Sequence, residues 1–187
     1  MENMLPTDEL KNEHRVIERM LKLLWDASNR LERGNEIDLE FFVDAGDFFS
    51  NFADKCHHAK EENLLFEKMV ERGVPREVGP IPVMLSEHTD GRMHVKKINE
   101  LAGKKLGPKE QAQLVENGRD YVSMLTKHIQ KEDSILYPMA NDVLTAGDQR
   151  ELEEGFERIE TEIMSPGIHE RYHKMIEGWE KRLGTHI

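Results

Sequence analysis

Residues 121–139 have the sequence YVSMLTKHIQKEDSILYPM, and this stretch carries the strongest structural signal in the chain. Its apolar residues recur at intervals of three and four, which is the period of one face of an α-helix. His128 and Glu132 occupy consecutive positions of that face, between Leu125 and Ile135. Since residues four apart lie one above the other on a helix, we expect this imidazole and this carboxylate to point together into the core.

A second segment repeats this arrangement. Residues 56–66, CHHAKEENLLF, can be aligned with residues 127–137, KHIQKEDSILY. His57 then falls on His128 and Glu61 falls on Glu132. Two helices would therefore present matching pairs of ligands, as expected for a pseudo-symmetric site that holds two metal ions.

Single histidines interrupt the apolar faces of two further predicted helices. His14 lies between Leu10 and Ile17, and His88 follows Met84 in the same way. A lone histidine on an apolar face is most often a core residue with its hydrogen bonds satisfied. Here, however, every helix of the predicted bundle directs at least one imidazole inward, and two helices add a carboxylate.

Metal binding accounts for this concentration of titratable groups in a core. Two buried glutamates without a cation would each cost several kcal/mol in desolvation. A divalent cation offsets that cost and favours the neutral, ligating imidazole. Imidazole and carboxylate together suit iron, manganese or zinc. One tetrahedral zinc ion needs only four ligands, so a set of this size favours two metal ions over a structural zinc site.

Helical periodicity extends over the whole chain, and no stretch alternates as a strand does. We therefore expect an all-α fold, in which residues 1–145 form an up-down-up-down four-helix bundle and residues 146–187 form a helical extension packed on it. The acidic runs at 151–154 and 157–162 are interpreted as solvated helix faces. The helices are expected at about 8–33, 38–73, 80–102 and 108–144 in the bundle, and at about 148–164 and 168–183 on either side of Ser165-Pro166-Gly167.

The bulk composition narrows the class of protein. The 187 residues include 34% charged and 37% hydrophobic residues, the balance of a soluble helical domain. The formal net charge of −11 argues against nucleic acid or an anionic membrane as a partner, because either needs a basic surface. No apolar run approaches the roughly 20 residues that span a bilayer, and the first residues lack a signal-peptide pattern. Cys56 is the single cysteine, so we expect a reducing, cytoplasmic setting.

From about residue 8 to residue 140 the sequence resembles the hemerythrin-like family, also called the HHE cation-binding domain. The matching motifs are Glu13-His14, HHAKEE at 57–62, Glu87-His88 and HIQKED at 128–133. A longer bacterial and archaeal subgroup carries a similar C-terminal tail. The resemblance implies two iron ions bridged by two carboxylates and by an oxo or hydroxo group, with an open position for a small ligand. The implied iron ligands are His14, His57, Glu61, His88, His128 and Glu132.

The sequence departs from oxygen-carrying hemerythrins on the third helix. Those proteins have a second histidine four residues after the first, whereas here His88 is followed by Arg92. His58 and His173 are the two candidates for the missing nitrogen ligand. His58 lies about 100° round the helix from His57, and its alternative interpretation is a surface residue. We prefer His173, which would come from outside the bundle, fill the open coordination position and weaken the case for simple oxygen carriage.

Two classes of function follow from this interpretation. The class that we favour is a binding or sensing protein whose di-iron centre takes up dioxygen or nitric oxide, because the sequence contains no motif for a substrate pocket, a second cofactor or a fused signalling domain. The second class is a di-iron oxidoreductase that acts on hydrogen peroxide or nitric oxide. Iron storage or delivery, which needs a labile site, is a third interpretation.

Overall fold

The computed structural model describes residues 4–163 and 167–184. Regular structure in these ranges is helical throughout, so the predicted all-α fold is confirmed. The break expected at Ser165-Pro166 lies outside the described residues. The α-helices are α1 (Pro6–Glu32), α2 (Glu40–Phe48), α3 (Phe66–Glu71), α4 (Pro80–Leu101), α5 (Pro108–Lys131), α6 (Tyr137–Val143), α7 (Ala146–Ile163) and α8 (Ile168–Leu183), and the π-helical segments are η1 (Phe49–His58), η2 (Glu61–Leu65) and η3 (Glu132–Leu136).

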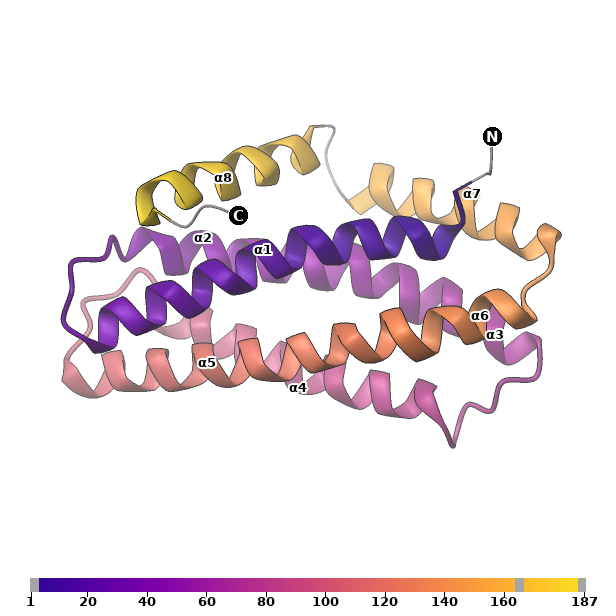
Figure 1. Cartoon of the computed structure of the whole chain (residues 1–187), viewed down its shortest axis with the longest axis horizontal. Helices are drawn as coiled ribbons and strands as arrows, with labels where there is room; N and C mark the ends of the chain where they lie inside the picture. The colour runs from indigo at the N-terminus through magenta and orange to yellow at the C-terminus, as the bar shows by residue number, and fades with distance from the viewer. Residues whose placement is uncertain (1–3, 164–166, 185–187) are drawn as a thin grey trace.

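Four long helical rods form the bundle (Figure 1). They are α1, the rod that runs from α2 through η1 and η2 into α3, then α4, and the rod that runs from α5 through η3 into α6. Each rod is antiparallel to the next along the chain, which confirms the predicted up-down-up-down arrangement. α1 packs against α5, α5 against α4 and α4 against α2, so the four rods surround one core.

The first rod illustrates why these segments fold as helices. Leu10, Ile17 and Leu24 lie on one face of α1, and none of them is more than 2% exposed. Pro6 occupies the first turn, where its missing N–H removes no helical hydrogen bond. Gly34 follows the end of the rod with a φ of 68°, a left-handed conformation that glycine adopts without a steric clash.

Two of the rods change to a π-helical path at matching places. η2 begins at Glu61 and η3 begins at Glu132, the two glutamates that are aligned in the internal repeat. A π-helical turn holds more residues than an α-helical one and therefore shifts which later side chains face the core. Leu136 is buried, whereas Ile135 is 54% exposed, so the prediction that Ile135 continues the apolar face is wrong.

A polar layer crosses the middle of the bundle core. The buried apolar residues form two clusters, one on each side of this layer. On α1, for example, His14 lies between Leu10 of one cluster and Ile17 of the other. The same order recurs on α4, where His88 follows Met84 of the first cluster and precedes Val95 of the second. The helix period thus places the predicted ligands at one level of the bundle.

The last two helices, α7 and α8, pack along one side of the bundle, over α1 and the rod formed by α2 to α3 (Figure 1). Trp179 of α8 packs edge-on against Phe41 of α2, with ring centroids 5.3 Å apart. Arg72, which directly follows α3, makes two hydrogen bonds of 2.7 Å to Asp148 of α7. Among the described helices, none is both long and apolar enough to cross a membrane.

Candidate metal centre

The structure brings seven of the eight predicted site residues together in the polar layer. They form two groups, and within each group one potential ligand atom per residue lies within 4.8 Å of the others. All seven residues are buried, and Glu61 belongs to both groups. The first group consists of His14, His57, Glu61 and Glu132, and the second of His58, Glu61, His88 and His128.

Three carboxylate oxygens of these groups are buried without a hydrogen-bond partner. They are Oε2 of Glu61 and both oxygens of Glu132. Imidazole Nε2 atoms surround them: His128 lies 3.0 Å and His14 3.2 Å from Glu132, and His88 lies 3.4 Å from Glu61. Buried carboxylate oxygens that lack donors are costly unless a cation neutralises them. The residues therefore fit a site that binds metal cations between the rods.

Each of the five histidines uses its other ring nitrogen, Nδ1, to contact a carboxylate outside the groups. Such contacts orient the ring and leave Nε2 as the nitrogen that faces the centre. The acceptors lie on neighbouring rods or one turn away, and sequence reasoning assigned none of them this role. The Nδ1–oxygen pairs are His14–Asp133 at 2.8 Å, His57–Glu13 at 2.7 Å, His58–Asp54 at 3.3 Å, His88–Glu62 at 2.7 Å and His128–Glu87 at 2.9 Å.

A lysine or arginine side chain pairs with each of these carboxylates, which we call the outer carboxylates. Lys60 donates to Glu13 at 2.6 Å, Arg15 pairs with Asp133 and Lys131 pairs with Glu87. These imidazoles are therefore backed by carboxylates that are themselves paired with cations, an arrangement that raises the basicity of the ring as a ligand. The sequence signal that could have pointed to this shell is the carboxylate next to several of the ligands, in Glu13-His14, Glu87-His88 and Glu132-Asp133.

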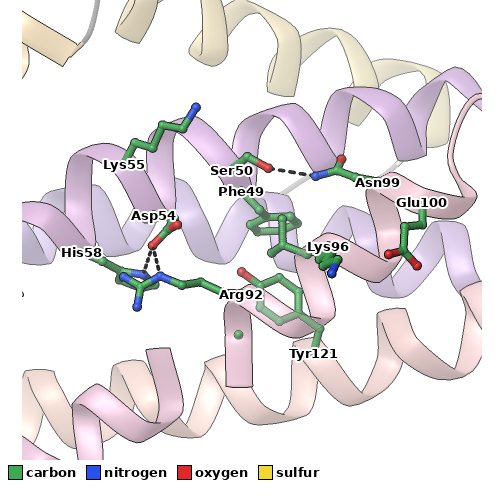
Figure 2. Close-up of a pocket in the computed structure, with 12 residues that line it drawn as sticks. Phe49, Ser50, Asp54, Lys55, His58, Arg92, Lys96, Asn99, Glu100 and Tyr121 are labelled. Atoms are coloured by element: carbon green, nitrogen blue, oxygen red, sulfur yellow. Dashed lines mark hydrogen bonds and ion pairs between the residues drawn. The ribbon is translucent and has the colours of Figure 1, made fainter. Parts of the chain in front are cut away.

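Arg92 occupies the position of α4 where oxygen-carrying hemerythrins have a second histidine. It does not offer a metal ligand but binds two of the carboxylates that contact the histidines. It donates hydrogen bonds of 2.7 Å to Asp54 and to Glu62, the partners of His58 and His88. Figure 2 shows Asp54 joined by dashed lines to the ring of His58 and to the guanidinium of Arg92, and all three residues line a pocket of about 410 Å³. The guanidinium thereby ties together the two histidines that stack at 3.8 Å.

His58, and not His173, lies with the other candidate ligands. Its side chain is 5% exposed, so the alternative interpretation as a surface residue is wrong. It joins the second group, whereas His173 is half-buried on α8 and belongs to neither group. The π-helical path of η1 and η2 supplies the reason, because it changes the angle between neighbouring residues and turns both His57 and His58 toward the core.

The electrostatics of the layer reflect its concentration of acids. Burial lowers the pKa of His14, but the nearby carboxylates of Asp133 and Glu132 outweigh it and raise that pKa to about 9. Acceptor carboxylates likewise raise the pKa of His88 and His128 against burial. Burial and the neighbouring histidines lower the pKa of His58 well below its ordinary value. Positive charge is therefore favoured beside the carboxylates, at His14, His88 and His128, and disfavoured at His58.

A family model described as the Hemerythrin HHE cation binding domain matches residues 5–140. Because that range is well over half of the 187 residues, the chain belongs to the hemerythrin HHE cation-binding family. This family binds metal cations, usually iron, and its matched region contains all seven clustered residues. The helices α7 and α8 lie outside the match.

Three mycobacterial proteins, each described only as an uncharacterized protein, are similar to the chain. They are Mb2018 of Mycobacterium bovis and Rv1995 and MT2051 of Mycobacterium tuberculosis. Each is 22% identical over 152 residues, which is 80% of this chain. The chain spans only 59% of the length of these relatives. No solved structure matches the chain significantly.

Proposed function

We propose that this chain is a non-haem di-iron protein that binds or senses dioxygen or a similar small ligand such as nitric oxide. The observation that carries the proposal is the set of unpaired oxygens on Glu61 and Glu132, enclosed by Nε2 atoms from four rods. Two overlapping groups that share Glu61 suit two neighbouring cations better than one. Mixed imidazole and carboxylate ligands suit iron, and the family usually binds iron.

In this proposal the two groups have different ligand sets. His14 and His57 would hold one iron, and His58, His88 and His128 would hold the other, with Glu61 and Glu132 as the carboxylates of the site. The first group offers fewer nitrogen ligands and would therefore leave more room for a small ligand. A bound iron pair would supply electrons and an exchangeable coordination position.

The residues around the first group are suited to enclosing such a ligand. Tyr137 is fully buried, and its hydroxyl lies 2.7 Å from Oε1 of Glu61 and 3.3 Å from Nε2 of His14. This hydroxyl donates its one proton to Glu61 and thereby orients that carboxylate beside the first group. Apolar clusters on both sides of the layer exclude water, which strengthens every polar contact inside it.

The proposal is tested by loading the protein with ferrous iron without oxygen and measuring iron per chain and the absorption spectrum. We expect two irons per chain, near-ultraviolet bands on oxidation, and a spectral change that reverses as oxygen pressure is raised and lowered. Glu132→Ala should lose at least one iron per chain. Zinc in place of iron in the protein from its native host, or rapid turnover of hydrogen peroxide, would contradict the binding assignment.

A further inference from the structure

Lys60 forms a buried ionic cluster beside the metal centre, on the side that α7 covers. Its side chain is fully buried, and its ammonium donates hydrogen bonds of 2.6 Å to Glu9, Glu13 and Glu160. An ammonium has three donors, so these contacts use all of them. Glu9 and Glu13 belong to α1, whereas Glu160 belongs to α7, beyond the family match. Glu160 belongs to the acidic run at 157–162 that the sequence predicts as a solvated helix face; its side chain is 36% exposed, but its carboxylate contacts Lys60.

The cluster also contains atoms of the kind that bind metals, but Lys60 already supplies its cation. Potential ligand atoms of Glu13, Cys56, Glu160 and His169 lie within 4.8 Å of one another. The Lys60 ammonium is 2.6 Å from both carboxylates of that set. Burial raises the pKa of the Cys56 thiol to about 12, which keeps it protonated. We therefore do not assign a third metal position here.

Glu13 joins this cluster to the metal centre. One of its oxygens, Oε1, accepts from Lys60, and the other, Oε2, accepts from Nδ1 of His57 at 2.7 Å. Glu13 accepts a hydrogen bond from the Nδ1–H group of His57, which leaves Nε2 of that ring free to face the centre.

The packing of α7 holds Glu160 at this place. A Cβ atom on Gly155 would lie 2.8 Å from Cδ1 of Leu64, so glycine lets α7 pack on η2 without displacing that side chain. Phe156, one turn before Glu160, is fully buried and lies under the Lys60 ammonium, 5.4 Å from it. Glu160 therefore reaches Lys60 from a helix that is itself packed against the ligand-bearing rod.

We propose that Glu160 is a positioning residue of the metal centre. Through Lys60 and Glu13 it holds the imidazole of His57 with Nδ1 protonated and Nε2 turned toward the first ligand group. The extension is then a structural part of the centre and not an appendage to it. The inference depends on the proposed function only in so far as His57 is a metal ligand.

The test compares Glu160→Gln with Glu157→Gln, a matched change at an exposed position of α7. In the metal-free protein, nuclear magnetic resonance follows the Nδ1 proton of His57, which should move upfield and exchange faster with water in Glu160→Gln only. Ferrous affinity, measured by competition with a chromophoric chelator, should fall about threefold to tenfold, less than the roughly 10–100-fold typical of a direct partner of a ligand. Glu160→Asp, which keeps the charge, should recover part of both effects.

The outcomes separate the two proposals. An unchanged Nδ1 signal in Glu160→Gln, with wild-type affinity and only a lower unfolding temperature, would overturn the positioning role. A changed Nδ1 signal in a protein whose wild type takes up no iron would uphold the positioning of His57 and overturn the di-iron function. Equal effects in Glu157→Gln would mean that any loss of charge on α7 perturbs the centre, which also contradicts the inference.

Discussion

Tyr137 donates a hydrogen bond of 2.7 Å to Oε1 of Glu61, across the core from one ligand-bearing rod to another. The phenol ring also lies nearly parallel to the imidazole of His14, with an interplanar angle of 14° and ring centroids 5.5 Å apart. Burial and the charge of Glu61 raise the pKa of Tyr137, so the hydroxyl stays protonated and remains a donor. This contact orients the shared carboxylate through the oxygen that is not left unpaired.

Tyr137→Phe should therefore destabilise the metal-free protein. The change removes a buried hydrogen bond to a charged group, a loss of about 1.5–3 kcal/mol in the free energy of unfolding, measured with urea. Tyr172→Phe is the matched control, because the Tyr172 hydroxyl donates at 2.9 Å to Asp47, whose side chain is 45% exposed and can be rehydrated. Equal losses in the two variants would contradict a special role for the Tyr137 contact.

Glu62→Gln should weaken metal binding while the fold stays intact. Glu62 accepts from Nδ1 of His88 at 2.7 Å, and a neutral amide is a poorer acceptor that can present its NH2 group instead. Loss of such an outer partner typically costs about 10–100-fold in metal affinity. The control is Glu67→Gln, a half-exposed glutamate one turn further on that pairs with Arg76. Wild-type affinity in Glu62→Gln would contradict the orienting role.

Arg92 stands on α4 where oxygen-carrying hemerythrins have a histidine, so restoring that histidine can be used to test the role of His58. His58→Ala should lower the iron content from two to about one per chain, because the second group then loses one of its three nitrogens. Adding Arg92→His to that variant restores the four-residue spacing from His88 and should recover part of the second iron. If His58→Ala keeps two irons and His173→Ala loses one, the assignment of the ligand to His58 is wrong.

Asp148 should make the stability of the fold depend on pH in the acid range. Hydrogen bonds from Arg72 and Thr145 hold its pKa well below the ordinary value of 3.8. Because the folded-state pKa is the lower one, this contact stabilises the fold above pH 3.8, and the contribution is lost as the pH falls through the folded-state pKa. Asp148→Asn should thus lower the unfolding temperature at pH 7, with a difference from wild type that shrinks below about pH 4.

The same comparison with Glu154→Gln, at an exposed position of α7, controls for the loss of one negative charge. That variant should follow the wild-type unfolding temperature across the whole range of pH. A difference for Asp148→Asn that persists unchanged into acid would mean that Asp148 stabilises α7 through shape, as a helix cap, and not through its charge.

Local periodicity was sufficient to predict the rods and the inward direction of most ligands. His14, His88 and His128 lie at positions where an apolar residue would continue the face, and burial at 1% exposure agrees with that pattern. The prediction failed where a helix left the α-helical path. Ile135 and His58 were assigned to the wrong environments because η1, η2 and η3 change the angle between successive residues.

The sequence alone determined that four amphipathic helices would direct histidines and glutamates into one core, because a helix repeats its face over a few neighbouring residues. Only the tertiary structure decided which carboxylate stands behind which imidazole. Glu13 is adjacent to His14 in the sequence, but its carboxylate contacts His57, 44 positions away. Glu160 meets Lys60 across 100 positions. Which side chains become partners depends on how the helices pack against one another, and that packing depends on the whole chain.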